Sequence, residues 1–170
     1  MKKIVATLWM LITVLLYGTA RSQTLPAIDE IKMEQSSDYD KAEPFVLQTA
    51  NYLLSSIYDK NNPDRVKAIQ FIIKWMSGSA HYSFRMDETS AKIAKGNDDV
   101  MAVYMAAMTK YVIENKEGSK DPTLVKLNAV KYTLDYCGNP IFKMRMTKYL
   151  KKLAEAREKG ELEKMLLDDK

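Results

Sequence analysis

Val-Met-Ala-Val-Tyr-Met-Ala-Ala-Met, the stretch at residues 100–108, contains no charged side chain, and the Tyr104 hydroxyl is its only polar side-chain group. A helix that is apolar on all sides belongs in the middle of a bundle, because no face of it suits water. Asn97, just before the stretch, is a good N-cap residue, and the two acids that follow it suit the first turn of a helix. The sequence therefore predicts a central helix over residues 98–116.

Further helices are predicted from a repeated start signal, a proline that follows a polar residue. Proline suits the first position of a helix because its missing N–H would be unpaired there, and a preceding Asn or Asp can cap the helix. The pairs are Glu43-Pro44, Asn62-Pro63, Asp121-Pro122 and Asn139-Pro140. We predict helices over residues 44–58, 63–77 and 122–137, one from residue 140 onward, and a short tail helix at 162–166.

The faces expected to point inward follow the helical period of the apolar residues. They are Val46, Thr49, Ala50, Leu53 and Ile57; Val66, Ile69, Ile73 and Met76; and Leu127, Val130, Leu134 and Cys137. No segment alternates steadily between apolar and polar residues, so we predict no strand.

The predicted fold class is all-α. We expect an irregular bundle of five to six helices, built from two helical hairpins, residues 44–77 and 98–137, plus a C-terminal helix. A shift of 59 residues aligns Asn62-Pro63 with Asp121-Pro122, which leaves open whether the two hairpins arose by duplication.

The beginning of the chain has the composition of a secretory signal peptide. Lys2 and Lys3 precede an apolar run from residue 4 to 17, and small residues follow it. Because spanning a bilayer takes about 20 apolar residues, an uncleaved anchor is the less favoured alternative. We expect cleavage after Ser22, or alternatively after Ala20. The product would be an exported protein, periplasmic or extracellular, and soluble after cleavage.

We divide the chain into a signal peptide at residues 1–22, an acidic flexible arm at 23–42 and a single helical domain at 43–170. The whole sequence carries 26 basic and 22 acidic side chains, a net charge of +4. Removal of the signal takes away three basic residues and no acid, which leaves 23 against 22, a net charge of +1. So small a net charge gives no electrostatic reason to bind nucleic acid, and we expect no such partner.

Sequence motifs of the common catalytic and cofactor sites are absent. The chain has no HExxH, CxxC, GxGxxG or GxSxG motif and no Walker loop. One histidine and one cysteine are too few for a typical zinc site. Cys137 shares a stripe with Leu134, so we expect a buried core residue rather than a nucleophile paired with His81. We predict no catalytic residue, no metal site and no cofactor.

The connection at residues 79–86, Ser-Ala-His-Tyr-Ser-Phe-Arg-Met, contains the strongest candidate for a binding site. It interrupts the helices and gathers the single histidine with aromatic, cationic and hydroxyl groups, and loops on a rigid scaffold often carry binding residues. The side chains that could hold a small anionic or aromatic ligand are Trp75, His81, Tyr82, Phe84 and Arg85. The alternative, which the length of the connection favours, is that Tyr82 and Phe84 seal the bundle while His81 and Arg85 face water.

Charge is unevenly distributed along the chain. Residues 29–43 carry a net charge of −4, whereas residues 141–159 carry +5. A basic helix with an apolar face can lie on an anionic membrane surface. The apolar residues of this segment, Phe142, Met146, Leu150 and Leu153, are equally what a terminal helix presents to a bundle core. We favour this docked interpretation over membrane contact through 141–159.

Three short stretches carry a resemblance to known proteins: Lys-Trp-Met-Ser-Gly at 74–78, Lys-Gly-Asn-Asp-Asp at 95–99 and Leu-Asp-Tyr-Cys at 134–137. In this order, behind a signal peptide and an Asn-Pro helix, they resemble small exported all-helical proteins from Bacteroidota that have no assigned activity. The resemblance covers most of the chain after the signal. It implies export and a helical fold, and it carries over no functional residue.

We therefore expect an exported, non-enzymatic helical protein that binds a peptide, a protein or a small molecule. The alternative is an enzyme of the cell envelope with a site around His81. The sequence does not indicate an oligomeric state.

Overall fold

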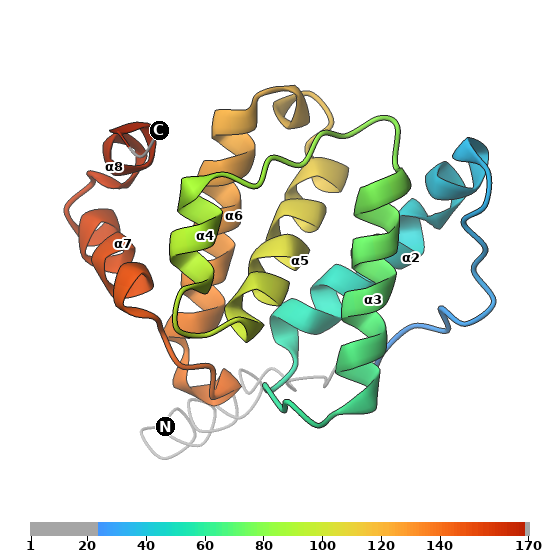
Figure 1. Ribbon diagram of the computed structural model, residues 1–170, viewed down its shortest axis with the longest axis horizontal. Coiled ribbons are helices and arrows are strands. Elements are labelled where there is room, and N and C mark those ends of the chain that lie inside the picture. Colours follow the sequence, from blue (N-terminus) through green and yellow to red (C-terminus); the bar gives the residue numbers. More distant parts are fainter. Residues whose placement is uncertain (1–23, 169–170) are drawn as a thin grey trace, which may run out of the picture.

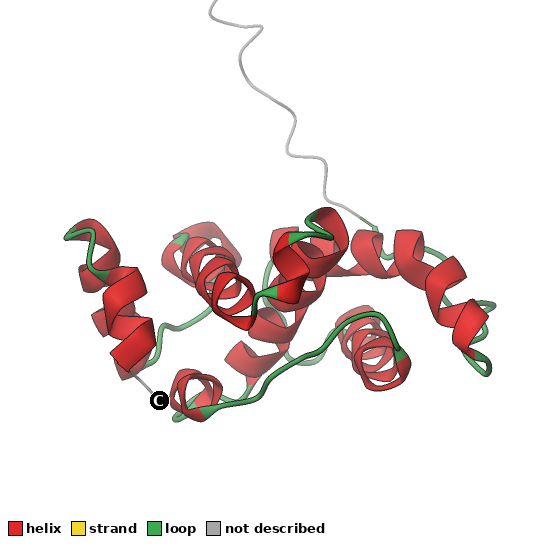
Figure 2. Ribbon diagram, turned by 90° about the horizontal axis from the view of Figure 1, so that it is seen from above, coloured by secondary structure: helices red, strands yellow, loops and turns green. Residues whose placement is uncertain are grey.

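The computed structural model describes residues 24–168, so the predicted signal peptide lies outside the described part of the chain. In that part the chain forms helices and loops and no strand (Figure 2). The α-helices are α2 Ser36–Ser55, α3 Pro63–Gly78, α4 Glu88–Ala94, α5 Asp99–Glu114, α6 Pro122–Gly138, α7 Lys148–Glu158 and α8 Leu162–Asp168, and the 3₁₀ helices are η1 Gly118–Lys120 and η2 Pro140–Phe142. The predicted all-α class is confirmed. The expected five to six helices are too few, because α4 was not predicted.

Helix α5 lies in the middle of the bundle, with α4 and α6 on one side of it and α2 and α3 on the other (Figure 1). Seven of the nine residues at 100–108 are buried, and Met101 and Met105 are partly buried and packed against the core. The predicted central helix is thus confirmed. The stripe from Leu127 to Cys137 on α6 is also buried as expected.

Helix α2 begins eight residues earlier than predicted, so Pro44 lies inside the helix rather than at its start. Asp38 fixes the earlier start, because its carboxylate accepts hydrogen bonds from the backbone N–H groups of Glu34 and Gln35 at 3.2 and 3.1 Å. These contacts form a capping box, which satisfies N–H groups that a helix end leaves unpaired.

The segment predicted to be a flexible arm, residues 23–42, includes the start of α2 and part of the hydrophobic core. Residues 36–42 are helical, and the preceding loop buries Ile28 and Met33, which are only 4% and 3% exposed. Both side chains belong to the hydrophobic core. The segment is acidic, but its few apolar residues are enough to hold it against the bundle.

Helix α3 buries only part of the predicted stripe, since Ile69 and Met76 are partly buried against the core. Val66 and Ile73, expected to point inward, are 46% and 42% exposed. The buried face instead contains Phe71 and Trp75, together with Ala68, Ile72 and Arg65. The larger aromatic side chains bury more apolar area than Val66 and Ile73, and this decides how the helix is rotated.

The C-terminal helix does not begin at Pro140 as predicted. Asn139 does cap a helical start, since its side chain accepts from the Ile141 N–H at 3.0 Å, but only the single turn η2 follows. Lys143 has a left-handed backbone with φ 58°, which ends that turn. Helix α7 begins after a second cap, Thr147. The architecture is therefore two hairpins, α2–α3 and α5–α6, with α4 between them and two short helices after them.

Cys137 is buried, as predicted, with 6% of its surface exposed. Burial raises the pKa of its thiol to about 12, because the thiolate would lose its hydration. We therefore expect a thiol reagent such as Ellman's reagent to label Cys137 only after denaturation, since thiolate is the reacting species. Rapid labelling of the native protein, or a disulfide-linked dimer on a non-reducing gel, would contradict this.

No helix among residues 24–168 is long and apolar enough to cross a membrane.

Candidate functional site

The connection between α3 and α4 crosses the bundle in an extended form and alternates its side chains. Tyr82 and Phe84 are partly buried, whereas His81, Ser83 and Arg85 are exposed. The rings of Tyr82 and Phe84 lie 5.4 and 5.8 Å from that of Trp75, which is fully buried. The structure thus brings three of the five candidate residues together as a core cluster, and it separates His81 from Arg85.

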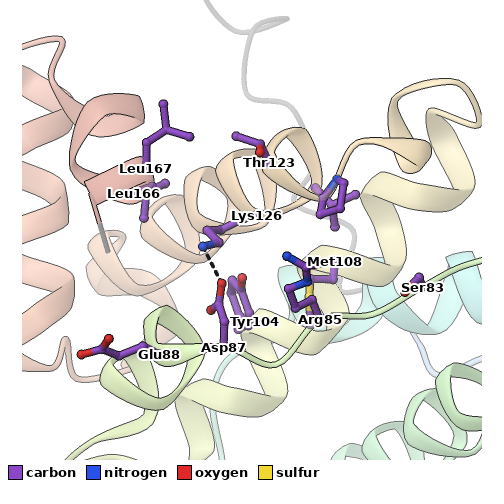
Figure 3. A pocket seen from close by; sticks show the side chains of 12 residues that line it. Ser83, Arg85, Asp87, Glu88, Tyr104, Met108, Thr123, Lys126, Leu166 and Leu167 are labelled. Carbon is purple, nitrogen blue, oxygen red and sulfur yellow. Dashed lines mark ion pairs between the residues drawn. The ribbon is translucent and has the colours of Figure 1, made fainter. Parts of the chain in front are cut away.

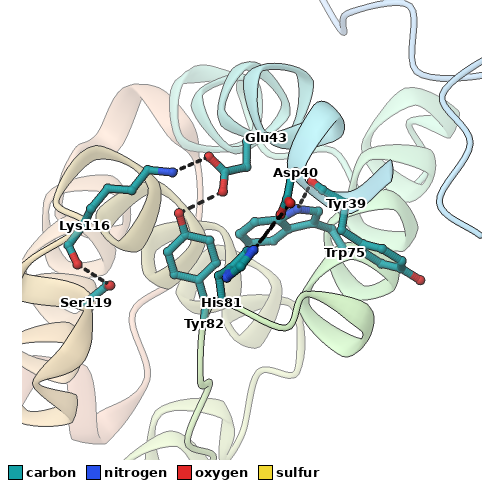
Figure 4. A network of polar contacts seen from close by, with 8 residues as sticks. All are labelled: Tyr39, Asp40, Glu43, Trp75, His81, Tyr82, Lys116 and Ser119. Carbon is teal, nitrogen blue, oxygen red and sulfur yellow. Dashed lines mark hydrogen bonds and ion pairs between the residues drawn. The ribbon is translucent and has the colours of Figure 1, made fainter. Parts of the chain in front are cut away.

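His81 and Tyr82 line a polar hollow of about 420 Å³ with residues of α2 and of the segment after α5 that includes η1 (Figure 4). Glu43 lies at its centre: its carboxylate accepts a hydrogen bond from the Tyr82 hydroxyl at 2.9 Å and pairs with Lys116 at 2.7 Å. His81 Nε2 lies 3.2 Å from the Asp40 carboxylate.

The polar side chains of this hollow are paired with one another. The hydrogen bond to Glu43 raises the pKa of Lys116, so the lysine stays charged and paired. Burial raises the pKa of Tyr82, and its hydroxyl remains a donor to Glu43. The network therefore joins α2, the connection and the segment that follows α5, and it leaves few free groups for a ligand.

Arg85 points to a different place, a cleft of about 350 Å³ between the connection, α5, α6 and α8, which we call the α4–α8 cleft (Figure 3). Its apolar walls are formed by side chains of α5, α6 and α8: Met108, Pro122, Val125, Leu166 and Leu167. Its polar groups are Arg85, Asp87, Tyr104 and Lys126, with Ser83, Glu88 and Thr123.

Two interactions hold the Asp87 side chain in place at the floor of the cleft. One carboxylate oxygen caps α4 by accepting from the Ser90 N–H at 3.2 Å, and the other pairs with Lys126 of α6. Both side chains of the ion pair are about one-fifth exposed, 21% and 19%. A pair so shielded from water interacts more strongly than a surface pair.

Tyr104 brings the central helix to the same floor, with its hydroxyl beside the Asp87 carboxylate (Figure 3). The residue is 1% exposed, and within residues 24–168 its hydroxyl makes no hydrogen bond. Burial, and then the negative charge of Asp87, raise the pKa of Tyr104, so the hydroxyl stays protonated and can donate. Because Tyr104 lines the cleft, this hydroxyl is available to a ligand there.

Arg85 is exposed at the rim, and no acidic side chain within the described residues pairs with it. The neighbouring Glu88 pairs with Lys92 at 3.0 Å. The α4–α8 cleft therefore combines a free guanidinium, a free hydroxyl donor and an ion pair with apolar walls.

No protein-family model, no curated protein and no solved structure matches this chain. The interpretation of the site therefore depends on its geometry.

Sequence reasoning placed Arg85 in the site but missed Asp87, Tyr104 and Lys126. Asp87 is the N-cap of α4, the helix that was not predicted. Tyr104 gave one usable signal, a single hydroxyl inside an apolar run. Lys126 gave a second usable signal, because it lies between two apolar residues, Val125 and Leu127, which are both buried.

Proposed function

We infer that the chain is an exported, non-enzymatic binding protein whose α4–α8 cleft holds a small molecule or a peptide end with an anionic group and an apolar body. The observation that carries this inference is Tyr104, a residue only 1% exposed whose protonated hydroxyl lies at the cleft floor. The volume of about 350 Å³ also lies within the range of roughly 300–1,000 Å³ typical of small-molecule sites.

The charges of the cleft favour an anion. Asp87 and Lys126 neutralise each other, and Glu88 is paired with Lys92, which leaves Arg85 as the unpaired charge at the rim. A guanidinium presents a planar set of donors that matches a carboxylate or sulfonate group. The apolar body of the ligand would lie against Leu166, Leu167 and Met108.

Anilinonaphthalene sulfonate, an anion with an apolar ring system, is a suitable probe of this cleft. We expect saturable fluorescence enhancement with the wild-type protein and an affinity about tenfold lower for Arg85→Gln, because a charge-assisted hydrogen bond is lost. Tyr104→Phe should weaken binding similarly without lowering the melting temperature, since its hydroxyl has no protein partner to lose.

The matched control for Arg85→Gln is Arg145→Gln, which removes an exposed arginine that does not line the cleft. Competition by decanoate should displace the fluorescent anion from the wild-type protein. Equal affinities of Arg85→Gln and Arg145→Gln, or no saturable binding to the wild type, would contradict the proposed ligand class.

Export is tested separately, at the N-terminus. We expect the protein recovered from the cell envelope or the medium to begin at Gln23, because the small-residue pattern places cleavage after Ser22. N-terminal mass spectrometry measures this directly. A recovered protein that retains Lys2 and Lys3 would argue for an anchor instead.

A further inference from the structure

The two most exposed large hydrophobic side chains of the described chain belong to segments that meet at one end of the bundle. Ile141 is 65% exposed and Ile57 is 52% exposed. Their neighbours in sequence are joined by a backbone hydrogen bond, from the Tyr58 N–H to the Phe142 carbonyl, at 2.8 Å. In Figure 1 the turn η2 and the connection from α2 to α3 lie side by side at the bottom of the view.

Ile57 was expected to lie on the inner face of its helix, but α2 ends at Ser55 and leaves it outside. Ile141 lies in η2, which is held in place by the Asn139 cap and by stacking of Phe142 on Tyr136 at 4.6 Å. Both isoleucines are thus fixed in exposed positions by ordered neighbours.

Several basic side chains follow Ile141 closely in the sequence. Residues 141–154 contain five cations and no acid: Lys143, Arg145, Lys148, Lys151 and Lys152. All five are exposed, and none of them forms an ion pair within residues 24–168. Acids also lie near this end: Asp99 accepts a hydrogen bond from the Tyr58 hydroxyl, and Glu155 follows Lys151 by one turn of α7. The positive charge is therefore concentrated in the run from Lys143 to Lys152. We call the two isoleucines and the five cations the basic end.

The inner face of α7 is already occupied. Leu150 and Leu153 are fully buried in the core, so the predicted docking of this helix is correct. This helix therefore cannot insert an apolar face into a bilayer, and only its charged outer face is available. Any membrane contact through this segment must be shallow and dominated by electrostatics.

We propose that the basic end docks on the surface of an anionic phospholipid bilayer, with the five cations against the headgroups and Ile57 and Ile141 in the interface. The charge is complementary to such a surface, and each nearby Lys or Arg adds about fivefold in affinity. The two isoleucines favour a bilayer over an acidic polypeptide as the partner, because the cations alone would suffice to bind an acidic polypeptide. A second copy of the chain is disfavoured, because two basic ends repel. This surface does not include the α4–α8 cleft, so the proposal stands independently of the ligand proposed for that cleft.

Vesicle co-sedimentation tests the proposal, with phosphatidylglycerol-rich vesicles compared with phosphatidylcholine vesicles. All variants are produced from the full chain, recovered after export and checked for the same N-terminus. We expect the wild type to sediment with the anionic vesicles only, and to be released by high salt because salt screens surface charge.

The charge variant is Lys148→Glu/Lys151→Glu/Lys152→Glu, for which we expect an affinity at least about tenfold lower. Its control, Lys41→Glu/Lys74→Glu/Lys131→Glu, makes the same change in net charge at exposed positions elsewhere and should bind nearly as the wild type does. Ile57→Ser/Ile141→Ser should also weaken binding, whereas Val66→Ser/Ile73→Ser, which alters exposed residues of α3, should not.

The proposal is overturned if the charge variant and its control bind equally, or if the wild type sediments with neither kind of vesicle. Polyglutamate serves as the probe for the competing partner. If it binds the wild type and the isoleucine variant equally while anionic vesicles bind neither, the basic end is a site for acidic polypeptides and the membrane proposal is wrong.

Discussion

Ala106→Asp is expected to abolish folding to a soluble protein. Ala106 is 0% exposed, and it packs in a cluster with Ala50, Leu53, Ala68 and Ile72, where α5 meets α2 and α3. A carboxylate at this position would be a buried ion or would have to be protonated. Either costs several kcal/mol, a large part of the roughly 5–15 kcal/mol by which a domain is stable. The soluble yield and the far-ultraviolet circular dichroism spectrum measure the effect.

His81→Ala is the matched control, because it removes a polar side chain from the surface. The pair of His81 with Asp40 is exposed on both sides, 62% and 49%, and such pairs contribute about 0–1 kcal/mol. We expect a melting temperature close to that of the wild type. A normally folded Ala106→Asp protein would show that the contact of α5 with α2 and α3 is not part of the core.

The helix starts show how far a local signal can be trusted. Asn62 and Asp121 cap α3 and α6 as predicted, with side chains that accept from backbone N–H groups at 2.9 and 2.8 Å. At Pro44 the same type of signal fails, because the capping box of Asp38 starts α2 at Ser36 and leaves Pro44 inside the helix. Glu43, unlike Asn62 and Asp121, is not a residue type that caps well.

Rotation of a helix about its axis is set by its neighbours. On α3 the apolar residues cover most of the circumference, so periodicity alone did not distinguish the stripe through Val66 from the one through Trp75. On α6 lysine and tyrosine side chains flank the apolar stripe at several positions. The periodicity therefore indicated a single inner face, and this face is the buried one.

The candidate site was predictable only in part, because it is assembled by tertiary contacts. Arg85 was found from the composition of its loop. The α4–α8 cleft exists because α8 packs against α6, and Leu166 and Leu167 then form a wall opposite Arg85 and Asp87. Closure of a cleft by residues about 80 positions apart leaves no signal in a single sequence.

Trp75→Ala is expected to lower the free energy of unfolding by about 3–5 kcal/mol, the cost of deleting a large buried aromatic side chain. Trp75 is 0% exposed, and it joins three parts of the molecule. Its indole Nε1 donates to the Tyr39 carbonyl of α2 at 3.0 Å, and its ring contacts Tyr82 and Phe84 of the connection. Urea denaturation followed by circular dichroism is the appropriate measurement, because the substitution removes the only tryptophan of residues 24–168.

Trp75→Phe separates the two contributions of this side chain. It keeps an aromatic ring against Tyr82 and Phe84 but removes the donor to Tyr39, a hydrogen bond worth about 1 kcal/mol. We therefore expect no more than about half the loss seen with alanine, since cavity volume dominates the cost. If both substitutions destabilise equally, the hydrogen bond to α2 is the main contribution. If neither does, the aromatic cluster is not part of the core, and Trp75, Tyr82 and Phe84 would be free to contact a ligand as the sequence suggested.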